Sequence, residues 1–130
     1  MKYTPLNVPV EYPMTAVIHN TAPVATAPWV MPGNYTVKLT VKDKVYTQNL
    51  AIKMDPRVKT PIAQLQKQHD LSVICYEGRK KSMVNFPEIA RKFNTLFEIL
   101  VHTDMPPTKQ TEKAVLETQQ ALLKLNTNGK

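Results

Sequence analysis

The residues that could carry chemistry are few in this chain and stand apart from one another. None of the histidines His19, His69 and His102 has a second ligand at a metal-site spacing. Cys75 stands among apolar residues, which predicts a buried and inert thiol. The carboxylates fall at expected turns, helix ends and helix surfaces, without the facing pair that glycoside hydrolysis needs. The sequence therefore predicts no catalytic residues, no cofactor and no metal site.

A net charge of +7 raises the question of an acidic partner. The one dense basic cluster is Arg79, Lys80 and Lys81, with Arg91 and Lys92 further along. We interpret the cluster as a solvated helix end, where cations also suit the helix dipole. The alternative is a basic nucleic-acid-binding domain that uses residues 79–92.

Trp29, the only tryptophan, stands between Pro28 and Val30. We expect it to be an anchor that packs on a sheet. The alternative is a carbohydrate-binding module in which Trp29 acts together with Tyr35 or Tyr46.

The first third of the chain is rich in proline and cannot be helical. Residues 14–19 are a possible short strand. No signal peptide is recognisable at the start, and no segment has the ~20 apolar residues that span a bilayer. We therefore expect no membrane partner.

Residues 34–54 predict a β-hairpin with strands at 34–41 and 45–54 and a turn at 42–44. Tyr35, Val37, Leu39 and Val41 alternate with polar residues, which predicts one buried and one solvated face. A lone hairpin is not stable in water. The sheet must therefore be covered by helices or completed by another chain.

From Pro61 the apolar residues recur at helical spacing. Three amphipathic helices are expected: one that begins at Thr60 and Pro61 and ends or frays within residues 78–84, one capped by Asn85, and one capped by Thr108. Their expected inward stripes include Ile62 and Leu65 in the first helix. The other two stripes are Ile89, Phe93, Leu96, Phe97 and Leu100, and Ala114, Val115, Thr118, Leu122 and Leu125.

The predicted fold class is α+β: a small antiparallel sheet, read as part of an immunoglobulin-like sandwich, followed by a three-helix antiparallel bundle. Residues 1–58 would hold the proline-rich segment and the hairpin. Residues 59–130 would form the helical tail and share one core with the first part.

One long stretch, APWVMPGNYTVKLTVKDKVYTQNLAIKMDPRVKTPIAQLQKQHDLS, resembles the C-terminal region of large bacterial sortilin-like β-propeller proteins built from BNR repeats. Proteins of this family are often labelled glycosyl hydrolases. The ending from Phe93 to Asn126 is similar to theirs as well. The chain departs from the family pattern at Lys44, where the turn has glycine, and at Asn49, where the second strand has proline.

The resemblance implies an accessory role without catalysis, as the C-terminal part of a larger exported, periplasmic or cell-surface protein. The implied partner is the propeller and sheet portion of that protein. An open β-edge also makes a homo-oligomer a prediction. The residues expected to take part in interactions are Trp29, Tyr35, Tyr46, Arg79, Lys80 and Lys81.

Overall fold

The computed structural model describes residues 2–4, 6 and 27–128. Residues 27–128 form two antiparallel strands, β1 (Gly33–Val41) and β2 (Lys44–Ile52). Three helices follow, α1 (Ile62–Ser82), α2 (Pro87–Val101) and α3 (Lys109–Asn128). The α+β class is confirmed. The predicted strand at 14–19 and His19 lie outside the described residues.

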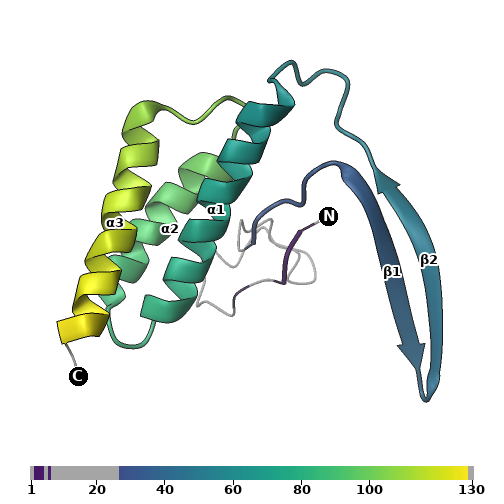
Figure 1. The fold of residues 1–130 in the computed structure, drawn as a ribbon, viewed down its shortest axis with the longest axis horizontal. Helices are drawn as coiled ribbons and strands as arrows, with labels where there is room; N and C mark the ends of the chain where they lie inside the picture. The colour runs from purple at the N-terminus through teal and green to yellow at the C-terminus, as the bar shows by residue number, and fades with distance from the viewer. Residues whose placement is uncertain (1, 5, 7–26, 129–130) are drawn as a thin grey trace, which may run out of the picture.

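The main core lies among the three helices, which run side by side in Figure 1. Phe93, Phe97 and Val115 are almost fully buried there. The predicted inward stripe of α2 is confirmed, since Ile89 and Leu96 also pack against this core. The stripes fail at two positions: Ile62 and Leu125 lie at the outer ends of their helices and are exposed.

Helix α1 ends at Ser82, within the range 78–84 in which the sequence predicted its end or fraying. Gly78 does not interrupt the helix, although glycine weakens helices. It is buried against the ring of Phe93. The missing side chain lets α1 and α2 approach closely, so the glycine serves packing rather than termination.

The helix starts confirm one of three predicted caps. The backbone N–H of Thr111 donates to Oγ1 of Thr108 at 3.1 Å, so Thr108 caps α3. Thr60 and Asn85 do not cap α1 and α2, which have Pro61 and Phe86 at their N-cap positions. The hydroxyl of Thr60 donates instead to the carbonyl of Asp104.

Two sets of polar contacts fasten other segments to α1. Nε2 of the buried Gln68 donates to the carbonyls of Leu100 and Thr103, where α2 ends. The hydroxyl of Tyr76 donates to the carbonyl of Thr4 at 2.8 Å. The beginning of the chain and the end of α2 are therefore both held on one helix.

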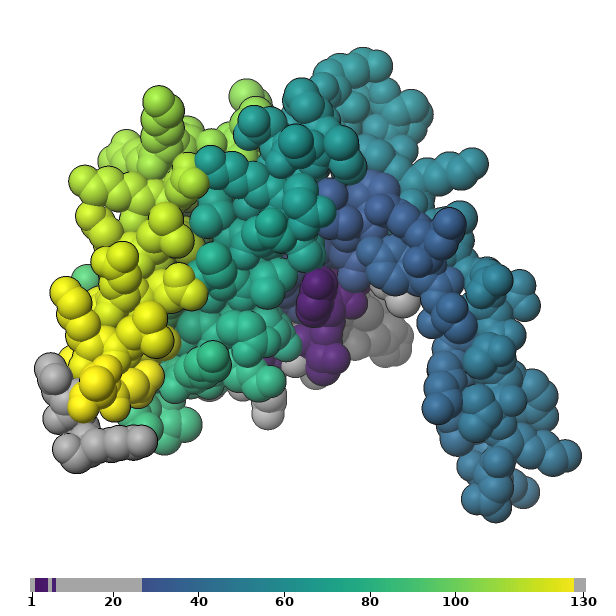
Figure 2. Space-filling view, in the orientation of Figure 1, coloured from purple at the N-terminus to yellow at the C-terminus, as the bar shows by residue number. Residues whose placement is uncertain are grey.

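The hairpin projects away from the helices as a two-stranded arm (Figure 1). The space-filling view shows the same arm standing clear of the helical body (Figure 2). The register pairs Tyr35 with Leu50 and Leu39 with Tyr46. The turn is Lys42-Asp43, one residue shorter than predicted, and Lys42 adopts a left-handed conformation with φ 54°.

Candidate interaction surface

The register sorts the hairpin side chains onto two faces of different chemistry, because directly paired residues point to the same side. One side, here called the apolar face, consists of Tyr35, Val37, Leu39, Val41, Tyr46, Leu50 and Ile52. Gln48 and Lys44 complete that side. The opposite side, here called the polar face, carries Asn34, Thr36, Lys38, Thr40, Thr47 and Asn49, together with Val45 and Ala51.

The apolar face lies open to solvent along most of its length. Leu39 is 58% exposed and Tyr46 55% exposed, while Val37, Val41 and Leu50 are also exposed. Only Tyr35 and Ile52, at the root of the hairpin, are partly covered. The prediction that this face is buried is therefore wrong for the chain by itself. The alternation is present, but no described element covers it.

The root of the apolar face turns toward the helices and meets a cleft. This root cleft, of about 490 Å³, lies between Ile52, Trp29 and Met54 on the hairpin side and Leu65 and Gln68 on α1. The hydroxyl of Tyr35 donates to the carbonyl of Met31 at 2.6 Å and fixes the incoming loop. The apolar face thus continues into the cleft instead of ending at the last strand residue.

Trp29 is exposed rather than packed, which corrects our expectation of a buried anchor. The indole is 53% exposed, and the ammonium of Lys2 lies over its ring, 4.3 Å from the centroid. Tyr46 is four residues beyond the level of Tyr35, about 13 Å further along the hairpin. Tyr35 and Tyr46 therefore lie apart on the hairpin, and the carbohydrate-binding alternative, in which Trp29 acts with one of them, stays a prediction.

The basic cluster is divided by the fold. Arg79 is buried, and this burial lowers the pKa of its guanidinium while the nearby charge of Glu98 raises it. Arg91 forms an ion pair with Glu88. Lys80, Lys81 and Lys92 are exposed. The predicted footprint for nucleic acid is thus reduced to three exposed lysines.

The described residues bring a tyrosine, a histidine and an aspartate together on α1. The hydroxyl of Tyr3 lies 3.2 Å from Nε2 of His69, and Nδ1 of His69 lies 3.3 Å from Oδ1 of Asp70. Ser72 donates to the backbone carbonyl of His69, so its hydroxyl does not face the imidazole as a nucleophile would. His69 is therefore a hydrogen-bonded histidine at the boundary of the helical core.

Cys75 is fully buried, as predicted, and burial raises the pKa of its thiol to about 12. A thiol with so high a pKa is not a nucleophile at neutral pH. Over residues 2–4, 6 and 27–128, no group of three or more potential ligand side chains is placed to hold a metal ion.

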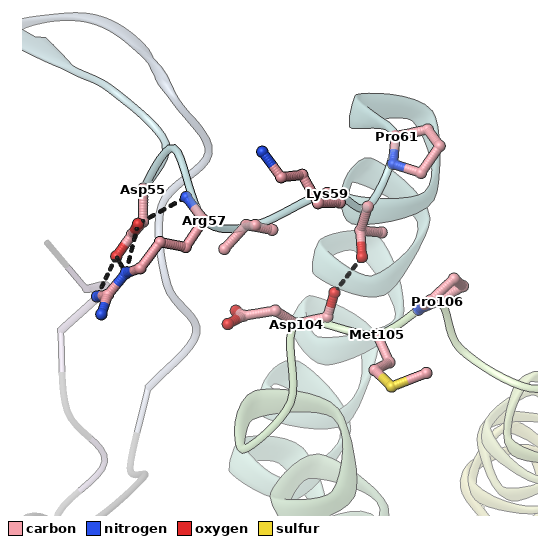
Figure 3. A pocket seen from close by; sticks show the side chains of 9 residues that line it. Asp55, Arg57, Lys59, Pro61, Asp104, Met105 and Pro106 are labelled. Carbon is pink, nitrogen blue, oxygen red and sulfur yellow. Dashed lines mark hydrogen bonds and ion pairs between the residues drawn. The ribbon is translucent and has the colours of Figure 1, made fainter.

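A second hollow, of about 700 Å³, lies between the 55–61 loop and the 104–106 loop (Figure 3). Arg57 forms a forked ion pair with Asp55, with Nη2 and Oδ2 2.6 Å apart. These hydrogen bonds lower the pKa of the Asp55 carboxyl. The hollow is a junction between two loops, and its other cation, Lys59, donates to the backbone carbonyl of Pro56 at 3.0 Å.

No protein-family model matches the chain, and no curated protein or solved structure matches it either. The likeness to sortilin-like proteins stays a prediction. In the part of the chain that the structure describes, no helix combines the length and apolar character that crossing a membrane requires.

Sequence reasoning named two residues of the apolar face, Tyr35 and Tyr46, as possible interaction residues. It assigned Val37, Leu39 and Val41 to a buried face of the first strand. It placed Leu50 and Ile52 on one face of the return strand together with Tyr46. The available signal was the shortage of strands: two strands cannot cover both sides of their own sheet.

Proposed function

We propose that this chain is a non-catalytic accessory module that uses its hairpin to join a larger protein. The observation that carries the proposal is the exposed apolar face, since soluble proteins rarely leave a contiguous apolar surface uncovered unless it binds something. The helical part is the support that holds the arm in place.

The sequence resemblance specifies the larger protein as an exported β-propeller protein, periplasmic or at the cell surface, of which this chain is the C-terminal part. In this proposal the hairpin completes an immunoglobulin-like sandwich with strands from elsewhere in that protein. The helices form an antiparallel bundle beside the sandwich. The chemistry of the described residues supports a role without turnover: Cys75 is buried, and Ser72 is engaged by the backbone.

Site-specific photo-crosslinking in cells that produce the protein tests this proposal. A photoreactive amino acid at Leu39 is expected to give a covalent adduct with a β-sheet segment, identified by mass spectrometry. The same group at Thr40 points to the polar face and is the matched control. Equal adducts from both positions, or none from Leu39, would contradict an interaction role for the apolar face. Turnover of a glycoside by the purified chain would contradict the absence of catalysis.

A further inference from the structure

We propose that the hairpin docks onto an antiparallel β-sheet whose surface is apolar and whose rim carries carboxylates. This inference rests on the proposed function, because it specifies the chemistry of the partner for the same surface. Spacing, area and charge each support it.

The spacing and the free edges of the hairpin suit a sheet. Apolar side chains recur at every second residue, about 6.6 Å apart along each strand, which is the repeat that a facing sheet presents. Within the described residues β1 and β2 have only each other as neighbours. The outer edges therefore offer unpaired N–H and C=O groups to which another strand can add.

The area of the apolar face argues against a second copy as the occupant. Two strands of nine residues make a face about 30 Å long and about 10 Å wide, or about 300 Å². Two copies packed face to face would bury about 600 Å², whereas stable interfaces bury about 1,200 Å² or more in total. A partner with a larger sheet would bury the missing area in two ways: one of its strands would pair with a free edge of the hairpin, and its surface would extend into the root cleft.

The positive charge of the hairpin indicates a negatively charged partner. Between residues 33 and 54 there are four lysines, Lys38, Lys42, Lys44 and Lys53, but only one carboxylate, Asp43. A second copy would bring the same positive charges together, which costs free energy. Lys44 shares the apolar face and Lys42 lies in the adjoining turn, so a rim of aspartate or glutamate around an apolar sheet would attract these two lysines.

Binding of two synthetic strands to the full chain tests the inference. One probe is a peptide of alternating valine and threonine with a glutamate at each end; the other has lysine at each end. Isothermal titration is expected to show about 10-fold tighter binding of the glutamate peptide at low salt, with the difference shrinking at high salt. Equal affinity for the two peptides would overturn the proposed charge of the rim.

Two charge-matched variants locate the binding face. Leu39→Lys adds a charge to the apolar face. It is expected to lower the affinity for the glutamate peptide about 10-fold, although the added lysine has the charge opposite to that of the peptide. Thr40→Lys adds the same charge on the polar face and is expected to change affinity less than 2-fold. Both side chains are exposed, so circular dichroism should confirm that both variants fold. Equal effects of the two variants would overturn the inference.

Light scattering and vesicle sedimentation distinguish the other occupants. A dimer that Leu39→Lys dissociates would make a second copy the occupant, and binding to anionic vesicles that Leu39→Lys abolishes would make it a lipid surface. Either result overturns the proposed sheet partner while leaving the apolar face as an interaction surface. Absence of all these interactions, together with absence of a crosslink from Leu39, would refute the proposed function itself.

Discussion

Replacing Gly78 by alanine tests how the helices achieve their close approach. A Cβ atom at this position would lie 2.5 Å from Cε2 and 2.7 Å from Cε1 of Phe93. Real Cβ atoms do not come so close to carbon, so the ring or the helix must move. Phe93 is fully buried, and its ring has no solvent to move into.

Two effects of opposite sign decide the magnitude. Alanine favours a helix interior over glycine by about 1 kcal/mol. Forcing one extra carbon into a packed core costs about 1–3 kcal/mol. We expect the steric term to dominate, with a net loss of about 1 kcal/mol in the free energy of unfolding.

Urea denaturation followed by far-ultraviolet circular dichroism measures this change. Phe93→Leu removes the ring atoms that the new methyl group would meet, so it provides a matched background. In that background Gly78→Ala is expected to stabilise the protein by about 1 kcal/mol, which gives a coupling of about 2 kcal/mol. Stabilisation by the same amount in both backgrounds would refute the steric account of Gly78.

Three further perturbations address the polar contacts and the thiol. Thr108→Ala removes the cap of α3 and should lower the free energy of unfolding by about 1 kcal/mol. Gln68→Leu deprives the carbonyls of Leu100 and Thr103 of their shared donor and should cost about 2 kcal/mol. Burial raises the pKa of the Cys75 thiol to about 12, whereas the same thiol in the unfolded chain loses its proton near pH 8.5. The free energy of unfolding should therefore be unaffected by this group below about pH 8.5 and decrease above it, by about 2 kcal/mol at about pH 10.

Each of these measurements has a control within the chain. Thr95 and Gln66 make exposed hydrogen bonds on α2 and α1, so Thr95→Ala and Gln66→Leu should change stability little. If these controls lowered the free energy of unfolding as much as Thr108→Ala and Gln68→Leu do, the assigned roles of the Thr108 cap and of the Gln68 hydrogen bonds would be refuted. Cys75→Ala should flatten the alkaline decline, and an unchanged decline would assign it to other groups.

The sequence predicted the helices better than their surroundings because helical periodicity is a local signal. The stripe of α2 is visible in the spacing of Phe93, Phe97 and Leu100 alone. The close packing of Gly78 is not a local property, because it depends on the ring of Phe93 from another helix. The burial of Arg79 likewise depends on tertiary packing, which a run of basic residues does not reveal.

The sequence predicted which residues make up the apolar face of the hairpin, but it did not predict that this face is exposed. Alternation at Tyr35, Val37 and Leu39 predicts which side chains share a face of the strand. Whether that face is covered depends on the number of layers that the chain can supply. That number is a property of the complete fold, and the order of residues within the hairpin does not contain it.

The ties between the beginning of the chain and α1 have a consequence for synthesis. Tyr3 is separated from His69 by 66 positions, and Thr4 from Tyr76 by 72. At about 5–20 residues per second, a ribosome takes about 3–15 s to deliver these partners. The hairpin, whose strands are joined by a two-residue turn, can pair in microseconds. The two strands can therefore pair and reopen many times before α1 has been made, because a lone hairpin is only marginally stable in water.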